Sequence, residues 1–178
     1  MRIEGLRGKE VQTLEGGHHH SAAVTKDGRH FTWGRLDGGQ LGIKFTEEQL
    51  QDEDLIRRDE NDRPRICLVP TEVTATGKAT AVGCGTDHTL FVNDQGLVYT
   101  TGFGTMGQLG LGDYDDVDVA TELPKKPCGG RHFVWAGAGG QFSVIAAPAD
   151  MAPPPKSAAA SETPAETPAE TPAVNGEE

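Results

Sequence analysis

The chain has 178 residues, a formal net charge of −11 and three cysteines. The acidic charge disfavours direct binding to nucleic-acid phosphates and favours polar or basic protein surfaces as partners. The cysteines form neither a CxxC pair nor an even disulfide set, and no apolar run approaches the roughly 18 residues of a membrane span. We therefore expect a soluble intracellular protein with reduced thiols and no membrane contact.

An internal repeat organises the chain. Residues 1–15 show weak alternation and no clear strand, and we interpret them as the remnant of a preceding repeat. Residues 17–42 then recur as residues 85–110, at a constant spacing of 68. A partial third copy, residues 135–146, matches residues 81–92 at a spacing of 54. A repeat of this kind indicates stacked supersecondary units.

Each full copy is predicted to be a β-hairpin. Its two short strands flank a turn glycine that supplies the positive φ of a tight turn, and these turn glycines are Gly28 and Gly96. Small residues alternate with apolar ones, as expected where sheets stack on both faces. The predicted strands are residues 20–24, 29–33, 88–92 and 97–101.

Each full copy closes with the motif Gly-Gln-Leu-Gly. The glycines permit a sharp bend, the leucine can fill the core, and the glutamine amide can bind backbone groups of the loop. Two occurrences in the same register make the motif specific. Its residues are Gly39, Gln40, Leu41, Gly42, Gly107, Gln108, Leu109 and Gly110.

Residues 43–66 depart from the repeat. Thr46 and Gln49 form a capping box, which predicts a helix of about three turns over residues 47–57, with basic residues at its far end matching the helix dipole. This insertion either decorates a loop or contacts a partner. Residues 67–70 follow as a short strand, whose proline favours an edge position.

Two further segments of the chain are rich in acidic residues. Residues 113–118 are an acidic loop that lacks the glycine and glutamate of an EF-hand, so we expect a solvated loop. Residues 149–178 contain Glu-Thr-Pro-Ala three times and almost no large apolar side chains, which predicts a disordered tail. Residues 16–148 therefore form the folded repeat segment.

Enzymatic chemistry has little support. Residues 102–107 satisfy GxGxxG after a strand, but no helix can start in the glycine-rich residues 107–112, so a dinucleotide site is rejected. No Ser-His-Asp or Cys-His set is spaced for nucleophilic catalysis. We expect no cofactor and no covalent reaction.

The histidines divide into structural and candidate functional positions. His18, His19 and His20 are adjacent on a strand and alternate in direction, so they cannot all bind one metal ion. His20 shares its register with His88, and we predict that both are buried and bonded to a neighbouring backbone group. His19 and Asp87 share the preceding position, as a functional pair or as solvated rim residues.

The motifs resemble the repeat of the regulator of chromosome condensation family. The resemblance covers residues 16–147 and includes Gly-x-x-His-[Ser/Thr], Trp33-Gly34, Gly-Gln-Leu-Gly and residues 137–141. It is most similar to the family's nuclear exchange factors for the GTPase Ran. It implies an all-β fold, a seven-bladed propeller of four-stranded blades, of which this chain holds about two to three. The family's basic N-terminal chromatin-binding tail and its wedge blade have no counterpart here.

The resemblance also implies a function. It assigns His19, Asp87 and, less directly, Asp37 to a rim that contacts a Ran-type small GTPase and promotes GDP release without covalent chemistry. Chromatin would be reached only through parts outside this chain, and the location would be nuclear, with cytoplasmic as the alternative. The competing hypothesis is a propeller-type interaction scaffold without exchange activity.

Overall fold

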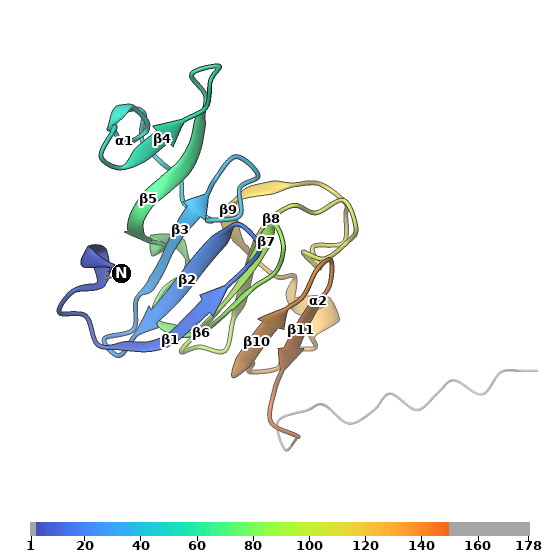
Figure 1. Ribbon diagram of the computed structural model, residues 1–178. Helices are drawn as coiled ribbons and strands as arrows, with labels where there is room; N and C mark the ends of the chain where they lie inside the picture. The colour runs from blue at the N-terminus through green and yellow to red at the C-terminus, as the bar shows by residue number, and fades with distance from the viewer. Residues whose placement is uncertain (1–2, 150–178) are drawn as a thin grey trace, which may run out of the picture.

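Antiparallel sheets dominate this computed structural model, which describes residues 3–149 (Figure 1). Three sheets follow one another in chain order, and the order of strands within the second is that of a simple meander. The predicted disordered tail, residues 149–178, lies outside the described residues except for Ala149. The all-β, partial-propeller prediction is confirmed.

The sheets have the following strands. The first has the order β1 (Val11–Gly16), β2 (His20–Thr25), β3 (His30–Arg35), β5 (Pro64–Glu72) and β4 (Ile56–Arg58). The second has the order β6 (Ala79–Cys84), β7 (His88–Asn93), β8 (Val98–Gly102) and β9 (Val117–Glu122). The third is the hairpin β10 (Trp135–Ala138) and β11 (Ser143–Ala146). The helices are η1 (Glu4–Leu6), α1 (Glu47–Gln51), η2 (Thr74–Thr76) and α2 (Lys125–Cys128).

The predicted hairpins are present in both full copies. β2 pairs with β3 and β7 with β8, each in regular antiparallel register. Their turns contain Gly28 at φ 83° and Gly96 at φ 70°, the left-handed region in which glycine has no steric penalty. The Asp-Gly and Gln-Gly signals therefore identified these turns correctly.

Strand β1 was missed by the sequence analysis. We predicted no clear strand over residues 1–15, and this is wrong, because residues 11–16 pair antiparallel with β2. Most β1 side chains are exposed, including Leu14 at 59%, so the strand lacks the apolar alternation that would reveal it. β1 is the edge of the first sheet, and its pairing with β2 holds it there.

Helix α1 is shorter than predicted. The capping box is present: the Thr46 hydroxyl accepts from Gln49 N at 3.2 Å, and Gln49 Oε1 accepts from Thr46 N at 2.9 Å. The helix ends at Gln51 rather than at residue 57. Ile56, only 2% exposed, pairs instead with Cys67 in the β4–β5 ladder, and this burial outweighs continuation of the helix.

The basic side chain at the C-terminal end of α1 belongs to strand β4. Arg58 was expected just past the helix but lies in β4, and its Nη2 donates to the Leu50 carbonyl at 2.7 Å. The guanidinium thus reaches a carbonyl of the last helical turn, where a cation is favourable.

The strand predicted at residues 67–70 is the centre of the longer β5. The β3–β5 register shifts between Thr32 and Gly34, and Pro70 lies opposite this irregularity. β4 covers β5 only from Pro64 to Cys67, so Pro70 lies where β5 is itself the edge. The proline therefore lies where no ladder bond is lost.

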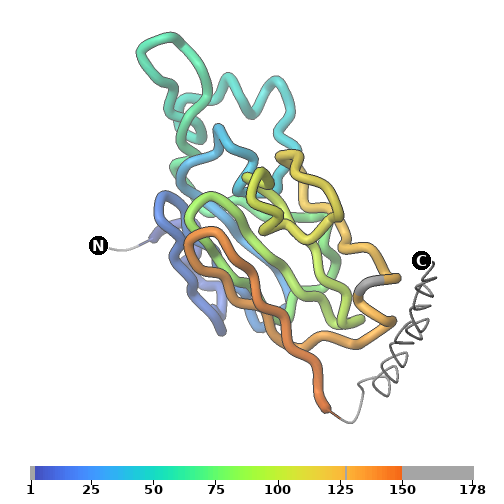
Figure 2. Tube along the Cα trace, turned by 90° about the vertical axis from the view of Figure 1, so that its right-hand side faces the viewer, coloured from blue at the N-terminus to red at the C-terminus, as the bar shows by residue number. Residues whose placement is uncertain are grey.

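The sheets stack face to face (Figures 1 and 2), and apolar cores lie between them. One core lies between the first and second sheets, and a second lies between the second sheet and the β10–β11 hairpin. A third, smaller cluster of Leu41, Ile56 and Cys67 lies beneath the insertion, which projects from the first sheet with α1 and β4.

Candidate functional site

The candidate rim residues lie just before equivalent strands. His19 immediately precedes β2, and Asp87 immediately precedes β7. Their backbones are held in the same way, because Arg35 N donates to the His19 carbonyl at 2.9 Å and Phe103 N donates to the Asp87 carbonyl at 2.8 Å. The repeat therefore presents one side chain per sheet at the same end of the stack.

His19 and Asp87 contact each other across the two sheets. Nδ1 of His19 lies 3.6 Å from Oδ1 of Asp87, with the side chains 44% and 34% exposed. Oδ1 of Asp87 is buried and has no hydrogen-bond partner within the described part of the chain. The exposed part of this carboxylate, beside the imidazole ring of His19, is a place where a donor from a partner would be favourable.

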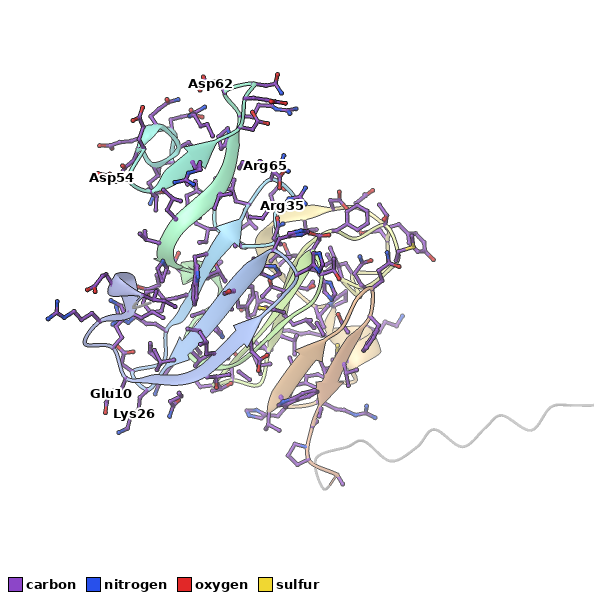
Figure 3. All side chains as sticks on the ribbon, viewed as in Figure 1. Glu10, Lys26, Arg35, Asp54, Asp62 and Arg65 are labelled. Carbon is purple, nitrogen blue, oxygen red and sulfur yellow. The ribbon has the colours of Figure 1, made fainter. Side chains whose placement is uncertain are left out.

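Asp37 is held by two arginines. It lies in the turn after β3 and accepts from Arg35 Nε at 2.5 Å and from Arg35 Nη2 at 3.3 Å. Arg65 Nη1 of β5 approaches the same carboxylate at 3.5 Å. Figure 3 shows Arg35 and Arg65 together at this end of the first sheet. Asp37, and to a lesser degree Asp87, raises the pKa of Arg35.

His20 and His88 are buried, as expected, but their partners differ from the prediction. His20 Nε2 lies 2.7 Å from the Thr89 hydroxyl, and His88 Nε2 lies 2.9 Å from the Ser143 hydroxyl. We expected a neighbouring backbone group, whereas each histidine bonds a hydroxyl of the following repeat. The repeat register could have suggested it, because Thr89 and Ser143 are equivalent.

The hydroxyls fix the histidine tautomer. The Thr89 hydroxyl donates to the Gln40 carbonyl at 2.7 Å, and the Ser143 hydroxyl donates to the Gln108 carbonyl at 2.8 Å. Because each hydroxyl proton is used, His20 and His88 must donate from Nε2. Burial lowers the pKa of His20 to about 4 and also lowers that of His88. Both rings are therefore neutral structural groups.

The Gly-Gln-Leu-Gly loops have the expected internal bonds. Gln40 Oε1 accepts from Gly38 N, and Gln108 Oε1 accepts from Met106 N, both at 2.9 Å. Leu41 is 1% exposed and Leu109 is 3% exposed. The glutamine ties its own loop while its carbonyl receives the hydroxyl of the next repeat.

His30 is a third inter-sheet histidine, and the sequence analysis missed it. Its Nε2 donates to the Ala81 carbonyl of β6 at 3.0 Å, and its Nδ1 lies 2.8 Å from the Thr76 hydroxyl. Burial lowers its pKa to about 4. The second copy has Val98 at the equivalent position, so the repeat carried no signal for His30.

The described residues offer little support for metal binding or for thiol chemistry. Within residues 3–149 no group of three or more His, Cys, Asp or Glu side chains could hold a metal ion, and no helix there is long and apolar enough to span a membrane. Burial raises the pKa of the Cys84 thiol to about 12 and raises that of Cys67. These thiols are protonated at neutral pH and are poor nucleophiles.

Stacked antiparallel blades with a polar rim define a segment of a β-propeller repeat protein. The model of the regulator of chromosome condensation (RCC1) repeat matches residues 27–92 and 95–146, and a second model of that description matches residues 79–108. The chain belongs to the regulator of chromosome condensation repeat family.

Individual relatives support this assignment. Protein pim1 of Schizosaccharomyces pombe is 37% identical over 145 residues, 81% of this chain and 26% of that protein. The guanine nucleotide exchange factor SRM1 of Saccharomyces cerevisiae is 30% identical over 135 residues, 75% of this chain and 27% of that protein. The crystal structure of Saccharomyces cerevisiae Prp20p superposes with a TM-score of 0.70 at 29% identity, over 78% of this chain and 31% of that chain. The chain therefore spans about a quarter to a third of these relatives.

Proposed function

We propose that this chain is part of a guanine-nucleotide exchange factor that acts on a Ran-type small GTPase through the rim containing His19, Asp87 and Asp37. The observation that carries the proposal is the His19–Asp87 contact, in which two consecutive repeats present polar side chains 3.6 Å apart. It is supported by relatives that include the guanine nucleotide exchange factor SRM1 and by Prp20p, which binds Gsp1p and histones.

The mechanism needs binding energy alone. A factor that binds the nucleotide-free GTPase more tightly than the loaded one weakens the nucleotide by the same ratio. The Asp87 carboxylate, whose side chain is 34% exposed, offers an acceptor to a partner donor, and His19 offers a ring beside it. Asp37 acts mainly by orienting Arg35 and Arg65. The proposal includes no cofactor and no covalent step.

The setting of this activity belongs to the same proposal. A nuclear location is proposed, with the cytoplasm as the alternative, and chromatin contact would be made by parts outside this chain. The second candidate is an interaction scaffold without exchange activity. It is favoured by relatives of other kinds, such as the ultraviolet-B receptor UVR8 of Arabidopsis thaliana, 37% identical over 118 residues, 65% of this chain and 23% of that protein.

A graft tests the proposal. Residues 3–149 would replace the matched segment of pim1, and release of labelled GDP from a Ran-type GTPase would be measured. We expect the graft to stimulate release. His19→Ala and Asp87→Asn should each lower the rate by about tenfold, the loss of one well-placed polar contact. Lys26→Gln is the control, since Lys26 and its partner Glu10 lie at the opposite end of the sheet (Figure 3).

The outcomes separate the two candidates. A graft that binds the GTPase without releasing GDP would support the scaffold and overturn the exchange function. Equal rates for His19→Ala and Lys26→Gln would remove His19 from the rim contact. We expect the 178-residue chain alone to have little or no exchange activity, because it covers only 26% of the pim1 relative.

A further inference from the structure

A cavity of about 410 Å³ lies between the insertion and the second sheet. We infer that it receives a lysine or arginine side chain of a protein partner that docks on the rim, an inference that rests on the proposed function. The cavity adjoins the rim because Asp37 lines it. Its lining also includes Leu36, Gly39, Leu41, Gly42, Ile43, Lys44, Phe45, Leu50, Asp118 and Val119.

The walls of the cavity are apolar. Leu41 is a buried residue of the cluster beneath the insertion, and half-buried Leu36, Ile43 and Phe45 pack against that cluster. Leu50 of α1 adds a further apolar side chain. Lysine and arginine bury their methylene stems along apolar surface while the charged end stays at the mouth.

The charge at the cavity is complementary to a cation. Asp118 of β9 lines the cavity and is exposed, and its neighbouring loop carries Asp113, Asp115 and Asp116 without a basic residue between them. Asp37 is already engaged by arginines, whereas Lys44 is the only basic side chain among the lining residues. Asp118 is therefore the carboxylate that would meet the partner's cation.

The loop and the strand β9 that line one side of the cavity are held together without a partner. Gly39 has φ 71°, and a Cβ there would lie 2.7 Å from both Cα and Oδ1 of Asp118. Ala120 N donates to the Gly42 carbonyl at 3.2 Å, and the Thr101 hydroxyl donates to the Gly39 carbonyl at 2.8 Å. A preformed cavity avoids the ordering cost that weakens binding.

The second copy provides an internal comparison. Its Gly-Gln-Leu-Gly loop adjoins a cavity of about 360 Å³, lined by residues that include Met106, Leu109, Gln141 and Phe142. None of the described lining residues there is acidic or basic. The first cavity thus has charged side chains from Asp37, Lys44 and Asp118, whereas the cavity at the second copy is lined by apolar and uncharged polar residues.

The test is an NMR titration of the methyl-labelled 178-residue chain with a blocked peptide of alternating lysine and alanine. We expect the methyl chemical shifts of Leu50 and Val119 to change, and those of Leu109 in the comparison cavity to stay the same. Asp118→Asn, which is isosteric, should weaken binding about three- to fivefold, as loss of one partly exposed ion pair does. Lys44→Gln should strengthen binding, because it removes a competing cation.

Two controls decide the result. Asp115→Asn removes a nearby exposed carboxylate that does not line the cavity and should leave binding unchanged, and a glutamate–alanine peptide should not shift Leu50. Equal weakening by Asp115→Asn and Asp118→Asn, or absence of shifts at Leu50 and Val119, would overturn the inference. Because no GTPase is present, failure here is distinct from failure of the proposed exchange function.

Discussion

At the scale of single residues, the central group is the hydroxyl that two repeats share. Thr89 lies in the second repeat, yet it accepts from His20 and donates to the Gln40 carbonyl, both in the first. Ser143 does the same for His88 and Gln108. One small side chain therefore satisfies two buried polar groups of its neighbour, and its removal leaves both unpaired.

We predict that Thr89→Val lowers the free energy of unfolding by roughly 2–4 kcal/mol, because a buried N–H and a buried carbonyl lose their partner. Thr89→Ser should retain most of the stability, since Ser143 serves the same role. Urea denaturation measures the difference. Ser21→Ala is the matched control, because Ser21 occupies the position equivalent to Thr89 in the repeat but is only half-buried. A cost for Thr89→Val no larger than for Ser21→Ala would contradict the bonding scheme.

At the scale of elements, the junction between the first Gly-Gln-Leu-Gly loop and β9 is closely packed. Gly39 faces Asp118, and a Cβ at Gly42 would lie 3.0 Å from the Thr101 side chain and 3.2 Å from Ala120 and Phe91. The glycines of the motif therefore serve two needs, a left-handed bend and a close approach of the next blade.

A comparison of Gly39→Ala with Gly8→Ala separates the cost of the left-handed backbone conformation from the cost of the close contact with β9. Both glycines have positive φ, at 71° and 75°, but a Cβ at Gly8 meets nothing within 4 Å. Gly8→Ala should therefore cost only backbone strain, about 1 kcal/mol. Gly39→Ala should cost roughly 1–3 kcal/mol more, because the β9 backbone must move. Thermal or urea unfolding checks both, and equal costs would show that the loop–β9 contact is unimportant.

Sequence patterns among neighbouring residues predicted the presence of most helices and turns correctly, but they predicted the ends of these elements poorly. The capping box at Thr46 and the turn glycines depend on neighbours in sequence, and both were identified. The length of α1 was wrong because Ile56 gains more by pairing with Cys67, a partner 11 residues away in β5. β1 was missed because its only signal is its pairing with β2.

In the candidate site, too, the features set by sequence neighbours were predicted and those set by distant partners were not. The repeat register placed His19 and Asp87 at equivalent positions, but only the packing of two sheets shows that the side chains meet. The arginines that hold Asp37 were not foreseen, since Arg65 belongs to the insertion and has no counterpart in the second copy. The role of these residues in partner binding stays a prediction.

At the scale of the whole molecule, buried neutral histidines join the sheets. His20 and His30 have pKa values lowered to about 4 by burial, and burial also lowers the pKa of His88. In the unfolded chain histidine titrates near 6.5. Below that pH the unfolded chain binds protons that the folded chain does not, so the folded state loses stability as the pH falls.

We predict constant histidine-linked stability above about pH 6.5 and a progressive loss between about pH 6.5 and 4, of order 3 kcal/mol for each of His20 and His30. Urea denaturation at several pH values measures the slope. His20→Gln keeps an N–H donor but does not titrate, so it should reduce the slope by about one proton, or about 1.4 kcal/mol per pH unit. An unchanged slope in this variant would show that His20 is not a buried neutral group.

The direction of the histidine bonds has a consequence for biosynthesis. Nε2 of each ring gains its partner only from a hydroxyl made later, 69 residues after His20 and 55 residues after His88. At about 5–20 residues per second, the ribosome would add those 69 residues in roughly 3–14 s. During that interval the first blade is a nascent structure with an open polar group in its core. These two inter-sheet bonds can therefore form only after the following repeat has been made, the His20 bond before the His88 bond.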